Sequence, residues 1–221
     1  MNTTGTVPDS PARARRPYTM TARARSVEQT RHRILDATTE LYLSRLAPDI
    51  ALDHIAERAG VSVQTVLRHF GSRSGLVEAA SRHARETVAE ERRVPVGDVD
   101  AAVRVLVDHY EKRGDGVLVL LAQEQTEELA RTVTDEGRAM HRAWVEEVFA
   151  PFLTPDDGQD GHDIEERTDL LVVATDVYAW KLLRRDRGLS RAATEARLRR
   201  LVGLLLDVGP GRSPDPDQPR E

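Results

Sequence analysis

The segment RAGVSVQTVLRHFGSRSGLVEAA, residues 58–80, decides the fold of the N-terminal part of this chain. Gly60 suits the end of one helix, and Ser62 suits the start of another only two residues later. Two short helices joined by so tight a turn bury a shared face. The second helix is then either a packing element or a surface that is presented to a partner.

Apolar residues recur at helical spacing on both sides of this turn, which predicts one helix over residues 52–59 and a second over 62–70. Such a helix-turn-helix can place its second helix in the major groove of DNA. Val66 and Phe70 are expected to face inward, and Gly71 to end the helix. The residues expected near its outer surface are Val63, Gln64, Leu67, Arg68 and His69.

The outer face carries side chains that can read base pairs. Gln64 and Arg68 are four residues apart and share a face; Gln pairs bidentately with adenine and Arg with guanine. Ser62 caps the helix and leaves other amides of its first turn free for a phosphate. Arg73 is within reach of a phosphate. The alternative is a helical hairpin that contacts another protein.

The longer stretch LDHIAERAGVSVQTVLRHFGSRSGLVEAA, residues 52–80, resembles the DNA-binding domain of TetR-type transcriptional regulators. The resemblance extends over about residues 27–80. It implies that Thr65 and His69 contact phosphates and that the positions flanking Thr65 read bases. The residues that fall on the family pattern are Ile55, Ala56, Ala59, Gly60, Val61, Ser62, Thr65, His69, Phe70, Ser72 and Leu76.

Several positions depart from that family pattern. Leu67 stands where the family usually has a DNA-contacting Tyr, so a phosphate hydrogen bond worth about 1 kcal/mol is lost, or Leu67 packs on a thymine methyl. Arg73 replaces a Lys and keeps the charge. Leu46 replaces a helix-ending Gly and Ala51 a capping Thr, which predicts looser helix ends.

Charge is distributed unevenly along the 221 residues. Residues 1–93 contain fifteen Arg against eleven Asp and Glu, a balance of +4, whereas the net charge of the whole chain is −5. The basic part therefore coincides with the helix-turn-helix, as expected if only this part meets phosphate. The alternative is a solvated basic tail. With no Cys, no signal peptide and no apolar run long enough to span a membrane, we expect a cytoplasmic protein.

Composition divides the chain into four parts. We expect a disordered Arg-rich arm over 1–25, a DNA-binding domain over 26–80, a helical ligand-binding and dimerisation domain over 81–207, and a disordered tail over 208–221. The expected fold class is all-α with about nine helices. The first helix is expected to be capped by Ser26 and to end near 44–46; the others are expected over 52–59, 62–70, 74–92, 98–112, 117–130, 134–150, 164–185 and 190–207.

The Arg-rich arm is a second candidate for DNA contact. Flexible basic arms of other DNA-binding domains enter the minor groove beside the site, and the alternative is an inert tail. The arginines concerned are Arg13, Arg15, Arg16, Arg23 and Arg25.

The last two expected helices carry apolar stripes. They resemble the helix pair through which many TetR-type regulators dimerise, and the alternative is packing within their own domain. A two-fold dimer would match a palindromic operator. The stripes consist of Leu170, Val173, Ala174, Val177, Tyr178, Ala192, Ala196, Leu201 and Leu205.

The middle of the chain gathers bulky side chains in helices that the family resemblance places around a ligand cavity. Plain core packing is the alternative for these residues. The candidate ligand contacts are His109, Tyr110, Met140, His141, Trp144 and Phe149. The identity of the ligand cannot be read from them.

Enzymatic and metal-binding motifs are missing from the sequence. The acidic loop around residues 156–163 and the cluster Glu124, Glu127 and Glu128 match no EF-hand or zinc-helix spacing, and there is no phosphate loop or nucleophile elbow. We therefore expect no enzyme, no cofactor and no metal. The expected function is a dimeric TetR-type repressor that a small molecule releases from a palindromic operator; the alternative is a helical adaptor module without sequence-specific DNA binding.

Overall fold

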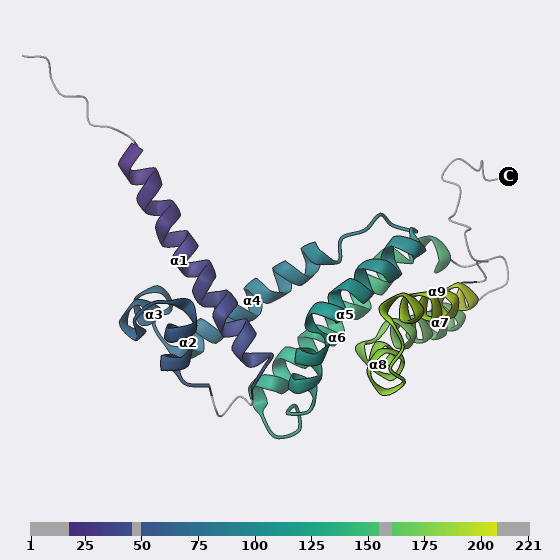
Figure 1. The fold of residues 1–221 in the computed structure, drawn as a ribbon. Coiled ribbons are helices and arrows are strands. Elements are labelled where there is room, and N and C mark those ends of the chain that lie inside the picture. The colour runs from purple at the N-terminus through teal and green to yellow at the C-terminus, as the bar shows by residue number, and fades with distance from the viewer. Residues whose placement is uncertain (1–17, 46–49, 155–160, 207–221) are drawn as a thin grey trace, which may run out of the picture.

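The computed structural model describes residues 18–45, 50–154 and 161–206, and within these ranges every regular element is helical and there is no strand. The all-α prediction is thus confirmed for the described residues. Figure 1 shows a small N-terminal lobe, a pair of long helices beside it, and a group of C-terminal helices beyond. The elements are α1 (Tyr18–Tyr42), α2 (Leu52–Ala59), α3 (Val63–Phe70), α4 (Arg73–Glu91), α5 (Val99–Leu121), α6 (Glu128–Val148), η2 (Ala150–Phe152), α7 (Gly161–Thr175), α8 (Val177–Lys181), η3 (Leu182–Asp186) and α9 (Arg191–Leu205).

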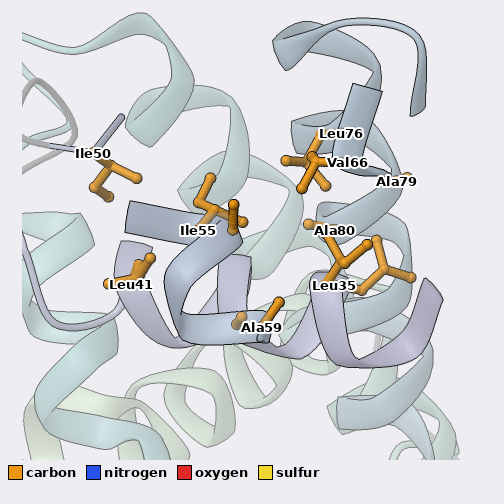
Figure 2. Close-up of a cluster of buried hydrophobic side chains, with 12 residues drawn as sticks. Leu35, Leu41, Ile50, Ile55, Ala59, Val66, Leu76, Ala79 and Ala80 are labelled. Carbon is orange, nitrogen blue, oxygen red and sulfur yellow. The ribbon is translucent and has the colours of Figure 1, made fainter. Parts of the chain in front are cut away.

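The N-terminal lobe has its own hydrophobic core, built from α1, α2, α3 and the first half of α4 (Figure 2). Ile34, Ile55, Val66 and Leu76 come from these four helices in turn and are almost completely buried. Because side chains from all four helices meet in this core, the angle between α2 and α3 is set by packing as well as by the turn between them.

Helix α1 begins at Tyr18, which corrects two predictions. Ser26 does not cap the helix but lies inside it, and residues 18–25 are helical rather than part of a disordered arm. The reason is that no Gly or Pro interrupts residues 18–45, and Ala and Arg there are good helix formers. The other expected arm residues, 1–17, and the expected tail over 208–221 lie outside the described residues.

Helix α5 is continuous from Val99 to Leu121, so the predicted break between residues 112 and 117 is wrong. Gly114 and Gly116 lie in this stretch, and both serve close packing. A Cβ at Gly114 would lie 2.6 Å from Cζ3 of Trp180, and one at Gly116 would lie 2.6 Å from Cβ of Leu43. These glycines let α8 and the end of α1 approach the backbone of α5.

The boundaries of the following helices also differ from the prediction. Residues 122–127 form turns, and α6 starts at Glu128, six residues before the expected start. The helix expected over 164–185 is interrupted at Asp176, whose backbone is extended (φ −72°, ψ 156°) and whose carboxylate accepts a hydrogen bond from the Tyr178 amide at 2.8 Å. Asp176 thus acts as the N-cap of α8.

The C-terminal helices share a second core around α5. Val103, Leu106 and Val107 of α5 are buried, together with Leu171 of α7 and Leu198 of α9. Trp180 of α8 is fully buried against Gly114. No helix in the described ranges is long and apolar enough to cross a membrane.

Candidate nucleic-acid interface and cavity

The turn between α2 and α3 is built as the sequence predicted. Gly60 has φ +65°, a conformation that Gly adopts without strain, and it ends α2. Two residues later the Ser62 hydroxyl caps α3 by accepting a hydrogen bond from the Thr65 amide at 3.2 Å. Ser62 Oγ also lies 3.0 Å from Thr65 Oγ1. The first turn of α3 is therefore capped by the side chain of Ser62.

The outer face of α3 presents the two predicted base-reading side chains. Gln64 and Arg68 are exposed and make no hydrogen bond or ion pair with any other described residue. Leu67, between them, is 39% exposed. A glutamine and an arginine that are both exposed and lack an intramolecular partner are free to bind base edges.

Val63 differs from its prediction as an outer-surface residue. It is partly buried and packs on the core of the N-terminal lobe with Phe70, because a valine in the first turn of α3 lies over the α2–α3 turn. Thr65 and His69 are half-buried at the edges of the exposed face. Arg31 of α1 lies 4.8 Å from the centre of the Phe70 ring, at the end of α3.

Arg73, predicted to reach a phosphate, also has a structural role. Its Nη2 donates a hydrogen bond to the backbone carbonyl of Ile50 at 2.8 Å and lies 3.4 Å from the Tyr42 hydroxyl. Ser72, which the sequence analysis did not identify as a cap, accepts a hydrogen bond from the Gly75 amide at 3.1 Å. These contacts fix the start of α4 beside α3.

Polar pairs hold α2 and α4 against α1. Arg58 Nη2 donates to Glu40 Oε2 at 2.6 Å, and His83 Nε2 lies 2.8 Å from Asp36 Oδ1. The Ala51 amide lies 3.4 Å from Nδ1 of His54, which partly replaces the cap that Ala51 cannot supply. The helix-turn-helix is thus attached to a long helix on two sides.

A cavity of about 240 Å³ lies between the N-terminal lobe and the long helix pair. Its walls come from α1 and α4 on one side, from α5 and α6 on the other, and from the α7–α8 break. Most of the lining surface is apolar. Of the six predicted ligand contacts, His109, Tyr110, Met140 and His141 line this cavity, whereas Trp144 and Phe149 pack in the core beside it.

Two buried histidines in this wall are held neutral. Burial, helped by the positive charge of Arg92, lowers the pKa of His109 to about 3 and that of His141 to about 4. Because Arg92 can only donate, Nδ1 of His141 accepts its hydrogen bond (3.2 Å), and Nε2 donates to Thr175 Oγ1 at 3.1 Å. Thr175 then donates to the Leu171 carbonyl at 2.6 Å.

Glu91, at the end of α4, is the centre of an ion-pair cluster. Its carboxylate accepts hydrogen bonds from Arg113 at 2.8 and 2.9 Å and from Lys112 at 2.8 Å, and it lies 3.3 Å from His109 Nδ1. The bonds from Arg113, opposed by burial, lower the pKa of Glu91 to about 2. The carboxyl group of Glu91 is therefore ionised, and both of its oxygens accept hydrogen bonds. The cluster joins α4 to α5.

Six lining residues with ionisable side chains were not predicted from the sequence: Arg85, Arg92, Arg113, Glu136, Arg138 and Asp176. Arg92, Arg113 and Asp176 line the cavity, yet Arg92 and Arg113 occur in strongly charged stretches that read as solvent-exposed. The wall from α1 was missed as well, because residues 38–43 were assigned to a different domain.

The acidic clusters weighed for metal binding do not form a site in the described ranges. Within those ranges, no group of three or more His, Asp or Glu side chains is arranged to hold a metal ion. Glu124 instead pairs with Arg138 and accepts a hydrogen bond from Thr134 Oγ1 at 2.9 Å. Residues 155–160 of the acidic loop, and the side chain of His162, lie outside what the structure describes.

Exposed apolar side chains gather on the C-terminal helices. Of the nine large hydrophobic residues exposed in the described ranges, six lie between residues 170 and 204. Ala174 and Val177 of the predicted stripes face the core instead. In Figure 1, α7 and α9 lie side by side at the end of the molecule, away from α3. The six exposed residues are Leu170, Val173, Tyr178, Leu182, Leu201 and Leu204.

Comparison with known proteins identifies the N-terminal domain. Residues 34–80 match the family described as bacterial regulatory proteins, tetR family. The chain is 39% identical over 94 residues to the HTH-type transcriptional repressor LfrR of Mycolicibacterium smegmatis, covering 41% of this chain and 49% of that protein. It is 38% identical over 56 residues to the transcriptional regulator TtgW of Pseudomonas putida, covering 25% and 42%. These matches span about half or less of each curated relative's length.

Solved structures share the fold over about four fifths of the chain. A putative TetR-family regulator from Rhodococcus sp. superposes with a TM-score of 0.60 at 18% identity, covering 80% of this chain and 99% of that one. A tetR-family regulator from Streptomyces coelicolor gives 0.59 at 20% identity, covering 79% and 81%. The helix-turn-helix geometry and the matched residues lead to one conclusion: residues 34–80 form a domain similar to that of the bacterial regulatory proteins of the tetR family.

Proposed function

We propose that this protein is a dimeric repressor of transcription that reads its operator through α3 and is released when a small molecule fills the cavity. The observation that carries the DNA-reading part is the pair Gln64 and Arg68, exposed on one face of a capped helix and without a described partner. The relative LfrR is a transcriptional repressor by name, which supports repression rather than activation.

The dimer is supported by the exposed apolar residues of α7, α8 and α9. Val173 and Leu204 are each 67% exposed, which is unusual for aliphatic side chains gathered in one region of a soluble helical domain. Burying them against the same surface of a second copy forms a two-fold interface. Two α3 helices related by that axis read two half-sites of a palindromic operator.

Release by a ligand is supported by the composition of the cavity wall. Thr38 and Tyr42 of α1 and Val88 of α4 line it on one side, and Val117 and Leu121 of α5 on the other. A molecule in the cavity therefore touches both the helices that carry α3 and those of the C-terminal domain. It shifts the equilibrium only by its difference in affinity for the two domain arrangements, and a tenfold difference is worth about 1.4 kcal/mol.

The test is fluorescence anisotropy with the duplex upstream of the protein's own gene and a scrambled duplex. We expect Gln64→Ala and Arg68→Ala each to weaken specific binding by about tenfold or more, because each removes a bidentate base contact. The matched control is Arg82→Ala, which removes an exposed arginine of α4 paired only with Glu78. It should change binding to both duplexes equally and slightly.

Equal binding of both duplexes, unaffected by either α3 variant, would contradict the proposal for this operator. A selection of bound fragments from genomic DNA then separates the two explanations. Enrichment of one sequence means that the operator lies elsewhere, and no enrichment means that α3 is a protein-contact surface.

A further inference from the structure

Arg92, at the end of α4, is a buried cation that lines the cavity and has no carboxylate partner. Arg92 is only 6% exposed, and no Asp or Glu among the described residues lies within ion-pair distance of its guanidinium group. The other arginines that line the cavity are all paired. Arg85 pairs with Glu136, Arg113 with Glu91, and Arg138 with Glu124.

The groups around Arg92 compensate its charge only in part. Its Nη1 donates to the neutral His141, and its guanidinium carbon lies 5.4 Å from the ring centre of Tyr110 and 5.9 Å from that of Trp144. Its Nε is buried and has no hydrogen-bond partner. A buried charge normally has a counter-ion and filled hydrogen bonds, so this arginine is prepared for an anion that the protein itself does not provide.

The rest of the cavity selects an apolar body. Beyond the charged groups near Arg92, the walls are dominated by aliphatic side chains such as Val88, Val117, Leu120 and Val133. The volume of about 240 Å³ exceeds the roughly 150 Å³ of an apolar cavity that accepts benzene. The space therefore holds a ring or a chain of several carbons beyond a charged group.

One carboxyl group, that of Asp176, also lines the cavity. Burial raises its pKa, which disfavours the ionised form, and one oxygen already accepts the Tyr178 amide. Three of the four lining arginines are each paired with a glutamate and the two lining histidines are neutral, so Arg92 is the positive charge that this wall leaves without a carboxylate partner. An ammonium group would be repelled by Arg92, whereas a carboxylate would match the planar fork of its guanidinium.

We propose that the cavity binds a small apolar carboxylate, with its charged group on Arg92 and its hydrocarbon body among the aliphatic side chains. The inference rests on the ligand-controlled function proposed above and gives its ligand a chemical class. It also assigns Arg92 the role of the residue that distinguishes an anionic ligand from a neutral or cationic one of the same shape.

The test is calorimetric titration of the full chain, without DNA, with three molecules that differ only in head group: octanoate, 1-octanol and octylammonium. We expect octanoate to bind about tenfold or more tightly than 1-octanol, and octylammonium to bind most weakly. Equal or tighter binding of 1-octanol or octylammonium would overturn the proposal.

A pair of variants locates the head group. Arg92→Gln should abolish the preference for octanoate over 1-octanol, whereas Arg85→Gln, which removes a lining arginine already paired with Glu136, should keep it. A preference that survives Arg92→Gln would refute the assignment. If Arg92→Gln does not fold by circular dichroism, the head-group series on the unchanged protein decides alone.

Because these titrations contain no DNA, they are independent of operator binding. Anisotropy of the operator complex with added octanoate is then measured separately. Octanoate that binds the cavity without displacing the duplex would leave the ligand class standing and contradict release by ligand. If the protein binds no DNA even without octanoate, the proposed regulator function is contradicted, while the result of the head-group titrations still stands.

Discussion

At the scale of single residues, Leu67 is the position where the proposed DNA-facing surface departs most clearly from the pattern of TetR-type regulators. It is 39% exposed between Gln64 and Arg68, at a place where related regulators commonly have a tyrosine. An exposed leucine offers a methyl contact to thymine but no hydrogen bond to phosphate. If α3 reads DNA as proposed, we expect this to limit the affinity of each half-site.

Restoring the hydroxyl should raise that affinity. We expect Leu67→Tyr to tighten operator binding by about 1 kcal/mol, or roughly fivefold, for each half-site, because it adds one phosphate hydrogen bond per subunit. Anisotropy with the specific duplex measures the change, and circular dichroism checks that the helix content is kept. Weaker binding of the specific duplex alone would indicate that Leu67 packs on a thymine methyl instead.

The buried histidines predict how stability depends on pH. Since burial lowers the pKa values of His109 and His141 to about 3 and 4, the unfolded chain takes up protons below about pH 6.5 that the folded chain does not. Their contribution is therefore complete above pH 6.5 and is lost as the pH falls toward 4. In this window, each histidine lowers the free energy of unfolding by about 1.4 kcal/mol for every pH unit that the pH falls.

Urea unfolding at pH 7.5 and pH 5.5 measures this loss. His141→Gln should reduce the pH dependence, because glutamine can still accept from Arg92 and donate to Thr175 but does not titrate. A variant as sensitive to acid as the unchanged protein would show that the effect comes from other groups.

Sequence reasoning succeeded for residues whose roles are local. Gly60, Ser62, Gln64 and Arg68 were identified because turn conformation, capping and exposure follow from positions a few residues apart. It did not identify Arg92, since a charged residue at a helix end normally lies in water. Its burial depends on Tyr110, Trp144 and His141, which are far away in the sequence.

At the scale of elements, the glycines of α5 show why helix boundaries were predicted less well than helix existence. A glycine inside a helical pattern usually signals an end, and Gly114 and Gly116 lie in or beside the stretch where a break was predicted. The helix continues because other elements, Trp180 of α8 and Leu43 after α1, occupy the space a side chain would need. Such contacts cannot be seen in local sequence.

Two alanine substitutions distinguish a glycine that close packing requires from a glycine that no neighbouring atom contacts. Gly114→Ala should destabilise the protein by about 1–3 kcal/mol, because its Cβ would meet Trp180 at 2.6 Å. Gly137→Ala, in α6, should stabilise it by about 0.5–1 kcal/mol, because its Cβ meets no atom within 4 Å and only helix propensity changes. Thermal unfolding measures both. A stabilising Gly114→Ala would contradict the close approach of Trp180.

The start of α1 at Tyr18 changes how the Arg-rich N-terminus is tested. Arg25 is exposed on the helix itself, while Arg13, Arg15 and Arg16 precede it. If these three contact phosphates, removing residues 1–17 should lower the salt dependence of operator binding by about 0.9 log units per lost contact. An unchanged slope of log Kd against log salt would mean that the arm does not touch DNA.

At the scale of the whole molecule, the exposed apolar surface of α7–α9 predicts the oligomeric state. Val173→Glu and Leu204→Glu each place a charge in the proposed interface, and an unpaired buried charge costs several kcal/mol. We expect both variants to be monomers at micromolar concentration by light scattering. The control, Val96→Glu, changes a valine that is 54% exposed but far from these helices in the sequence, and it should leave the dimer intact.

A monomeric mass for the unchanged protein would contradict the dimer outright.

The fold class and the helix-turn-helix could be predicted because periodicity and a long specific motif reach across residues 52–80. The interruption at Asp176 could not, since it depends on Thr175 and Tyr110: the Tyr110 hydroxyl donates to the Thr175 carbonyl at 2.9 Å, a group that a continuous helix would use itself.

The position of the cavity between two lobes has a consequence for exchanging parts between regulators. Because α1 and α4 form one wall, a chimera that takes its reading head from another family member also takes a new set of side chains at positions 38, 39, 42, 43 and 77–88. Under the proposed function, we expect operator choice and ligand response to be inherited together rather than as separate modules. Grafting only the exposed face of α3 changes the operator and leaves the cavity intact.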